Sequence, residues 1–173
     1  KMALELNGTT GVSLVQDGVV TAADLAPGAV TGTIVQIVTN STTTETTKTG
    51  SGFANTALAA TINKQQSSSK ILVLMSAQLQ TYRSGGGEAR GKSRIVRDGT
   101  EVLDFQMTTR SYDGENLHVV SALQALNAVD TTTGTGNRTY TLQIANNDTF
   151  GGTDYRLNLD GGSRSSVILL EIS

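Results

Sequence analysis

Apolar and polar positions alternate over short segments along most of the chain, which is typical of β-strands. In the segment 139–144, Tyr140, Leu142 and Ile144 fall on one face, and two threonines and a glutamine fall on the other. Gly- and Asn-rich turn signals separate such segments. The predicted strands are 33–39, 56–63, 70–81, a hairpin over 90–108, 117–128, 139–144, 155–159 and 166–172.

Many short strands at this spacing predict an all-β fold, namely an antiparallel β-sandwich of jelly-roll-like form. The run Ile71–Met75 is apolar at every position, so we expect a central strand that is covered on both faces. The segment 117–128 is ambiguous, because its apolar residues also fit a helical stripe. We interpret it as a strand.

The hairpin over 90–108 is predicted to turn at a three-residue loop, Arg97-Asp98-Gly99, with Gly99 in the left-handed position. This loop places Ile95 on the same face as Leu103, Phe105 and Met107. Arg90, Lys92 and Arg94 then share the other face with Val102, Asp104 and Gln106. A two-residue loop would instead mix the cations with the apolar face, which the hydrophobic pattern disfavours.

The first 32 residues differ from the rest, because their valines and leucines follow no sustained period. We therefore divide the chain into an N-terminal stem or linker, 1–32, and a β-sandwich head, 33–173. The stem cannot form a core alone. Either it packs on its own head, or several chains pool these apolar residues in a stalk, which is the interpretation we favour.

Composition excludes several classes of function. The chain has 13 Lys and Arg against 15 Asp and Glu, a net charge of −2, which argues against nucleic-acid binding. No apolar stretch is long enough to span a membrane, so no membrane insertion is expected. Without cysteine and with a single histidine, His118, one chain cannot build a Cys-ligated or multi-histidine metal site. We expect no cofactor and no metal.

No motif in the chain predicts catalysis. Gly85-Gly86-Gly87 and Gly50-Ser51-Gly52 lack the Lys and Ser/Thr of a phosphate-binding loop, and His118 has no acid partner in the sequence. His118 fits a packed or interface residue better than a ligand, although copies of it could meet on an oligomer axis. Carboxylate pairs for glycoside hydrolysis could be chosen in many ways, but they are mostly turn residues. We expect a protein that is not an enzyme.

Four segments together resemble the C-terminal region of bacteriophage tail fibres and related virion appendage proteins. They follow one another as a leader, a linker, the start of a strand and an apolar ending. The segments are Leu4-Glu5-Leu6-Asn7-Gly8-Thr9-Thr10-Gly11-Val12-Ser13, Val20-Thr21-Ala22-Ala23-Asp24-Leu25-Ala26-Pro27-Gly28-Ala29-Val30, Ser67-Ser68-Ser69-Lys70-Ile71-Leu72-Val73 and Ser166-Val167-Ile168-Leu169-Leu170-Glu171-Ile172.

The resemblance implies a homotrimer with a narrow stem and a β-sandwich head that meets the host surface. It also implies a location in the virion, contacts with other tail or capsid proteins on the N-terminal side, and a bacterial surface glycan as receptor. Because Lys1 precedes Met2, we expect the distal piece of a longer fibre. Tips of such fibres vary in sequence, so the resemblance assigns no binding residue.

Candidate receptor-binding residues come instead from the turns. Aromatic residues make up only 4% of the chain, so those that stand among polar residues are informative, and sugars stack on aromatic rings beside polar groups. The alternative is that these aromatics cap the core. The candidates, in loops 82–90, 110–116 and 146–155, are Tyr82, Arg83, Tyr112, Asp113, Asn116 and Phe150.

A basic stripe of Arg90, Lys92 and Arg94 is a second candidate, for phosphate or acidic sugar. Such a stripe is more often a solvated sheet face, here with Asp104 as its neighbour. Two other functions stay open. One is a structural virion component, such as a capsid fibre or decoration protein without a receptor, and the other is a soluble lectin or C1q-like trimeric sandwich.

Overall fold

A computed structural model describes residues 32–84, 87–113, 118–146, 153–159 and 162–173. These residues form strands and no helix, so none of them belongs to a helix that could cross a membrane. The predicted stem lies outside this part of the chain, apart from Gly32. The strands are β1 (Ile34–Thr42), β2 (Thr46–Lys48), β3 (Ala54–Lys64), β4 (Lys70–Arg83), β5 (Gly87–Arg97), β6 (Thr100–Asp113), β7 (His118–Asp130), β8 (Gly136–Asn146), β9 (Thr153–Leu157) and β10 (Ser165–Ile172).

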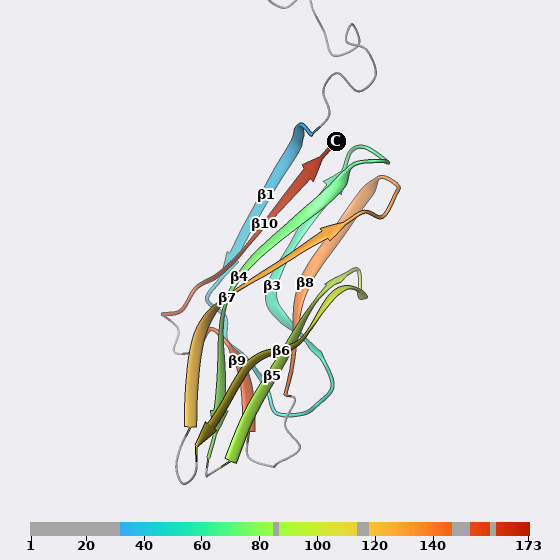
Figure 1. Ribbon diagram of the computed structural model, residues 1–173. Coiled ribbons are helices and arrows are strands. Elements are labelled where there is room, and N and C mark those ends of the chain that lie inside the picture. Colours follow the sequence, from blue (N-terminus) through green and yellow to red (C-terminus); the bar gives the residue numbers. More distant parts are fainter. Residues whose placement is uncertain (1–31, 85–86, 114–117, 147–152, 160–161) are drawn as a thin grey trace, which may run out of the picture. The chain divides into compact units, whose positions relative to one another are not determined.

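Two antiparallel sheets pack against each other, as the sequence predicts (Figure 1). The first has the order β1-β10-β4-β9-β2, and β7 pairs with β4 on its other side. The second has the order β3-β8-β5-β6. The pairs β1–β10, β3–β8, β4–β7 and β5–β6 are nested in the sequence, and the turn between β5 and β6 closes the innermost pair.

The core lies between the sheets and consists of every second residue of the facing strands. Tyr140, Leu142 and Ile144 are fully buried, as the alternation predicts, while Thr141 and Gln143 stay half-buried. From the opposite sheet, β4 and β10 supply most of the other large side chains. Burial of this alternating set gives the main stabilisation of the fold. Its apolar members include Leu58, Ile62, Ile71, Val73, Met75, Leu79, Ile95, Leu126, Tyr155, Leu157, Val167 and Leu169.

β4 is the central strand of the first sheet, but only one of its faces is fully buried. Ile71, Val73 and Met75 point into the core, whereas Leu72 and Leu74 on the other face are half-buried. The expectation of cover on both faces is therefore wrong for a single chain, because no described element lies over the outer face of this sheet.

The segment 118–130 forms strand β7, which confirms the interpretation as a strand. All thirteen residues from His118 to Asp130 pair with β4, a ladder that a helix could not form. Strand β2 was not predicted. It contains Thr46, Thr47 and Lys48 and has no apolar alternation, and its three residues are held by pairing with β9.

The β5–β6 hairpin turns through two residues rather than the predicted three. Asp98 (φ 49°) and Gly99 (φ 84°) form the turn, and Arg97 pairs with Thr100. A bulge at Val102 then supplies the odd residue that the longer loop was expected to supply, so Ile95 still lies opposite Leu103 and Arg94 opposite Asp104. The register thus confirms that Ile95 shares a face with Leu103, but the loop itself was wrong. The burial also differs from the prediction, because Leu103 is 38% exposed, whereas Val102, expected on the face of the cations, packs half-buried against the core.

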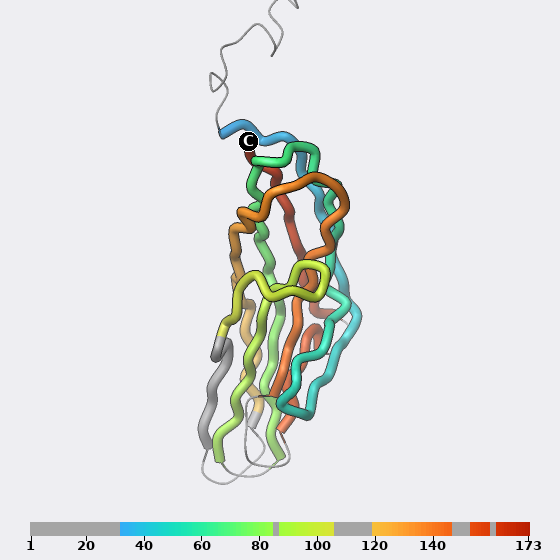
Figure 2. Tube along the Cα trace, turned by 90° about the vertical axis from the view of Figure 1, so that its right-hand side faces the viewer, coloured from blue at the N-terminus to red at the C-terminus, as the bar shows by residue number. Residues whose placement is uncertain are grey.

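The two ends of the sandwich differ. At one end, here called the proximal end, β1 begins beside the end of β10, with Ile34 opposite Ile172. At the other, the distal end, β4, β6 and β8 finish and β5, β7 and β9 begin. The Asp98-Gly99 turn lies at neither end but partway along the sandwich (Figures 1 and 2).

Candidate functional site

The three loops proposed to carry the receptor site arise from strands that meet at the distal end. Arg83, the last residue of β4, pairs with His118 of β7 and Thr153 of β9. Gly87 and Asp113 face each other where β5 begins and β6 ends. The connecting residues 85–86, 114–117 and 147–152 lie outside the described part of the chain, but the strands that bound them end together (Figure 1).

Tyr82 lies at this end, half-buried on the outer face of the first sheet. It is opposite Asp154 of β9 and Val119 of β7. The Arg156 guanidinium lies over the Tyr82 ring, 4.7 Å from the ring centroid. Arg156 also forms an ion pair with Asp154, with 2.7 Å between Nη2 and Oδ2. Both charged side chains are 21% exposed. We call Tyr82, Asp154 and Arg156 the Tyr82 cluster.

The polar residues beside the Tyr82 cluster extend it along β4. Gln80 is opposite Arg156 on one side and Ser121 on the other, and Gln80 Nε2 donates to Ser121 Oγ at 2.7 Å. An aromatic ring, a carboxylate, a guanidinium and a hydroxyl therefore lie on adjacent strands. These groups can stack on the apolar face of a sugar and bind its hydroxyls.

Arg83, although adjacent to Tyr82, lies on the opposite face of β4 and is 9% exposed. Its Nη1 donates to the backbone oxygen of Glu88 at 2.7 Å, and its guanidinium packs against Gly87, where a Cβ would come within 2.8 Å of Cζ. This position suits support of the β4–β5 connection rather than contact with a receptor.

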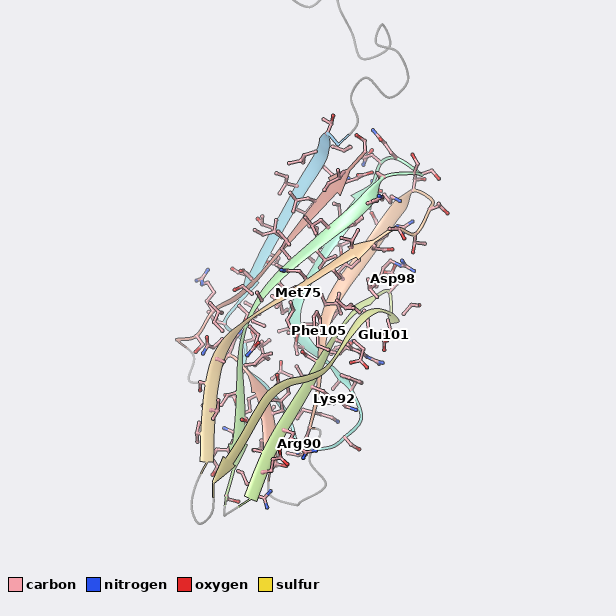
Figure 3. All side chains as sticks on the ribbon, in the orientation of Figure 1. Met75, Arg90, Lys92, Asp98, Glu101 and Phe105 are labelled. Atoms are coloured by element: carbon pink, nitrogen blue, oxygen red, sulfur yellow. The ribbon has the colours of Figure 1, made fainter. Side chains whose placement is uncertain are left out.

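The basic stripe lies on β5, where Arg90 is nearer the distal end than Lys92 (Figure 3). Arg90 forms an ion pair with Glu88. Lys92 Nζ and the Arg94 guanidinium both stand over the Phe53 ring, at 5.0 and 4.1 Å from its centroid. Arg94 also donates to Gln143 Oε1 (2.7 Å) and Glu101 Oε2 (3.1 Å). The stripe thus makes contacts within the sheet, with Asp104 opposite Arg94 as expected.

Four predicted site residues cannot be placed as side chains. Tyr112 and Asp113 belong to β6, at positions whose side chains lie outside the described part of the structure. Asn116 and Phe150 fall in the undescribed connections. The prediction for these four stays a prediction.

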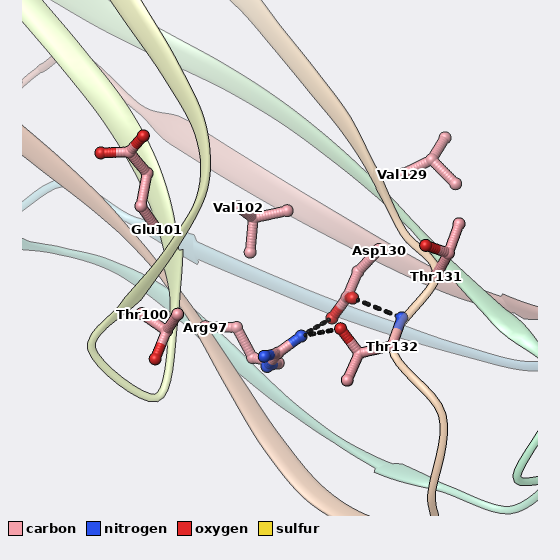
Figure 4. A pocket seen from close by; sticks show the side chains of 8 residues that line it. All are labelled: Arg97, Thr100, Glu101, Val102, Val129, Asp130, Thr131 and Thr132. Atoms are coloured by element: carbon pink, nitrogen blue, oxygen red, sulfur yellow. Dashed lines mark hydrogen bonds and ion pairs between the residues drawn. The ribbon is translucent and has the colours of Figure 1, made fainter.

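A pocket of about 360 Å³ lies nearer the proximal end, between the β5–β6 hairpin and the end of β7 (Figure 4). Asp130, 4% exposed, is its central charged group. Asp130 Oδ2 accepts hydrogen bonds from Arg97 Nη1 and Tyr140 Oη, both at 2.7 Å, and Oδ1 accepts from the Thr132 backbone N–H at 2.9 Å. The lining residues are Arg97, Thr100, Glu101, Val102, Val129, Asp130, Thr131 and Thr132.

The electrostatics of this pocket are those of a structural network. Burial alone would raise the pKa of Asp130, but hydrogen bonds from Tyr140, Arg97 and Thr132 outweigh it and hold that pKa well below its usual range. Burial and the bond to Asp130 raise the pKa of Tyr140. Since these groups satisfy one another, the Asp130 carboxylate serves to join the β5–β6 hairpin, β7 and β8. Across the described residues, no cluster of three or more His, Asp or Glu could hold a metal ion.

A second buried carboxylate, Glu171, ties the end of β10 to the β3–β4 turn. Its oxygens accept hydrogen bonds from Gln36 Nε2 (2.6 Å), from the backbone N–H groups of Gln65 and Gln66, and from Ser69 Oγ. Burial would raise the pKa of Glu171, but the bonds from Ser69, Gln36 and the two backbone groups lower it to about 2.

Sequence reasoning missed Asp154, Arg156 and Phe53 as neighbours of the candidate residues. The alternation in β9 does indicate that Asp154 and Arg156 share a face, away from the buried Tyr155 and Leu157. Their contact with Tyr82 depends on the pairing of β4 with β9, which are more than seventy residues apart. No local pattern encodes that pairing.

Comparisons with known proteins do not assign the chain to a family. No family model matches it, and no curated protein matches it. The solved structures that resemble it include a mutant VP2 protein of infectious bursal disease virus, at 13% identity and a TM-score of 0.37, covering 89% of this chain and 41% of that one. Another is the insecticidal delta-endotoxin Cry8Ea1 from Bacillus thuringiensis, at 15% identity and a TM-score of 0.34, covering 75% and 20%.

A third similar structure is dimeric latent PorU from Porphyromonas gingivalis, at 13% identity and a TM-score of 0.29, covering 84% of this chain and 14% of that one. The chain spans less than half the length of each of these proteins. TM-scores this low do not establish a shared fold, so a function has to be argued from the residues themselves.

Proposed function

We propose that the chain is the head of a bacteriophage tail fibre, which attaches as a homotrimer to a glycan of the host surface and has no enzymatic activity. The observation that carries this proposal is that the strand ends lie together at the distal end, where Tyr82, Asp154 and Arg156 lie half-buried on the outer face of the first sheet. Loops on a rigid scaffold are the usual carriers of binding. Strand β1 begins and β10 ends at the opposite, proximal end.

The proposed fold for this head is a jelly roll. A jelly roll is a long hairpin rolled into two four-stranded sheets, and it occurs in viral capsid and lectin domains. The nested pairs β1–β10, β3–β8, β4–β7 and β5–β6 support this topology, with β2 and β9 as an added pair. Because a fold does not fix a function, the topology is compatible with attachment but does not decide it.

Three linked copies would compensate for a weak affinity of each single glycan site. The Tyr82 cluster lies on an open face, and a single sugar there would gain few contacts. Linked sites on one assembly raise the effective concentration for the second and third contacts, so that avidity exceeds the affinity of one site. A repetitive envelope glycan suits this mode of binding.

An array of bacterial surface polysaccharides, probed with the labelled full chain, tests the proposal. We expect binding to a subset of the glycans. Tyr82→Ala should weaken that binding at least about fivefold, because loss of an aromatic anchor commonly costs more than 1 kcal/mol. The control is Ala57→Ser, at an exposed position of the other sheet, which should bind like the wild-type protein. Binding unaffected by Tyr82→Ala would exclude this cluster, and binding to no glycan would contradict attachment through sugars.

A structural virion component is the second candidate. The observation that favours it is the outer face of the first sheet near the proximal end, where Ile37, Val129 and Ile168 are exposed. Aliphatic side chains pack against protein better than against sugar. If the chain binds no glycan and is located on a part of the phage particle other than its fibres, this second function replaces the first.

A further inference from the structure

Apolar side chains form a continuous patch on the outer face of the first sheet, toward the proximal end. The pairing places Ile37, Leu170, Leu72 and Val129 side by side across β1, β10, β4 and β7, four strands that adjoin in Figure 1. Two residues along the strands, Ile168 and Leu74 continue the patch. We call these six residues the outer apolar face.

The outer apolar face is exposed in the single chain. Ile37 is 57% exposed, Val129 55% and Ile168 38%. Leu72, Leu74 and Leu170, which lie between them on β4 and β10, are half-buried by the side chains of the adjacent strands. An antiparallel sheet with a free face normally carries polar residues there. Contiguous apolar patches on soluble proteins mark interaction sites.

The outer apolar face itself carries no charge. Lys70 lies next to it, two residues from Leu72 on the same face of β4, and Arg164 Nη1 donates to Ser41 Oγ at 3.2 Å at its other edge. Three consecutive cross-strand rows contain only aliphatic residues, Ser, Thr and Asn. The rows are Ile37, Leu170, Leu72, Val129; Thr39, Ile168, Leu74, Asn127; and Ser41, Ser166, Ser76, Ala125. On the same face, the ion pair of Arg156 with Asp154 lies further along, at the distal end.

The chemistry of this face selects a second copy of the chain as its occupant. Two symmetry-related copies of a charged patch would bring like charges together, whereas a charge-free aliphatic patch is compatible with itself. A surface for a different protein typically carries charges that steer and select the partner, and these rows have none. Sheets also pack face to face through aliphatic side chains of this kind.

The size of the patch is adequate for such an interface. With about 4.8 Å between strands and about 3.4 Å per residue, four strands over the seven steps from Ile34 to Ser41 cover roughly 20 by 24 Å, a span that also includes Lys70 opposite Ile172. This projected area of about 450 Å² is more than half of the roughly 800 Å² that each partner buries in a standard stable interface. The flanking side chains can supply the rest.

We infer that the outer apolar face packs against another copy of this chain and forms the subunit interface of its oligomer. This inference rests on the homotrimer proposed above and names the surface that holds it together. The Tyr82 cluster, further along the same sheet, then lies beyond the interface at the distal end of each copy.

Light scattering on the full chain at micromolar concentration tests this interface. We expect a mass of three chains for the wild-type protein and of one chain for Ile37→Lys/Val129→Lys, with an unchanged circular dichroism spectrum. Ala57→Lys, at an exposed position on β3 of the other sheet, is the matched control and should keep the wild-type mass. A folded double variant that stays trimeric would overturn the interface and leave the homotrimer standing. A monomeric wild-type protein would overturn both.

Thiol accessibility covers the case in which the lysine variant does not fold. The chain has no cysteine, so Ile168→Cys and Ala57→Cys each introduce a single thiol. In the native protein, maleimide should modify Cys at position 168 at least about tenfold more slowly than at position 57, because burial in an interface protects it. Denaturant should remove the difference. Equal rates in the native oligomer would show that this face is free and would overturn the inference.

Discussion

Buried carboxylates in this sandwich act by anchoring turns, and Glu171 is the clearest case. It is the second-to-last residue of β10 and is fully buried. It accepts hydrogen bonds from the side chain of Gln36 and from the backbone N–H groups of Gln65 and Gln66. One side chain thus joins β1, β10 and the β3–β4 turn. The sequence gives no sign of this role, since a lone Glu in an apolar ending is expected at the surface.

The network around Glu171 makes stability depend on pH. The pKa of Glu171 is lowered from 4.5 to about 2 in the folded protein, so its contribution is complete above about pH 4.5 and is lost as the pH falls toward 2. Glu171→Gln removes this contribution at every pH. We expect the variant to be less stable at pH 7 and to lose less stability than the wild-type protein between pH 5 and pH 2.

Urea unfolding midpoints at several pH values measure this difference. Asp130, which also has a lowered pKa, stays in both proteins, so its contribution cancels in the comparison. Parallel pH profiles for the two proteins would show that the Glu171 carboxylate has no special environment.

At the scale of elements, the sequence predicted most strands because their faces are clearly distinguished. Tyr140, Leu142 and Ile144 alternate with polar residues, and a one-residue slip would expose all three. The same logic correctly placed Ile95 and Leu103 on one face of the hairpin, although Leu103 is exposed and Val102 packs against the core. It failed on the loop length, because a bulge changes register as effectively as an extra loop residue, and periodicity alone does not distinguish them.

The candidate site was less predictable than the strands. Tyr82 could be selected from the sequence because aromatics are scarce and it stands among polar residues. Its neighbours Arg156 and Asp154 could not, since they reach it through the pairing of β4 with β9. Arg83, adjacent to Tyr82 in sequence, points to the buried side because of the local alternation along β4, in phase with Ile71 and Val73.

The β5–β6 turn allows a direct test of the backbone argument. Gly99 has φ 84° and no atom within 4 Å of the position of an added Cβ, so Gly99→Ala introduces backbone strain without a clash. We expect a loss of stability of about 1–2 kcal/mol, the cost of the left-handed conformation for an L-residue. Thermal unfolding measures it.

Gly52→Ala is the control for this turn. Gly52 also has free space around its Cβ position, and its φ lies outside the left-handed region. Its replacement should leave the stability unchanged or raise it slightly. If Gly99→Ala proves as stable as Gly52→Ala, the two-residue turn with a left-handed Gly99 is not the conformation in solution.

At the scale of the whole molecule, the outer face of the first sheet is divided between two kinds of surface. Aliphatic residues such as Ile37 and Val129 occupy the part near the proximal end, and the Tyr82 cluster lies at the distal end. In the proposed head, the first part joins copies and the second contacts the host. Interfaces between permanent partners are apolar, whereas contacts with sugars need polar groups and rings.

The central claim, that this chain is the head of a tail fibre, is tested most directly by electron microscopy of intact phage particles labelled with an antibody to residues 34–173. The account predicts label at the free ends of the fibres, since the distal end has to reach the host. Label spread over the capsid would contradict the claim and would favour the structural component instead.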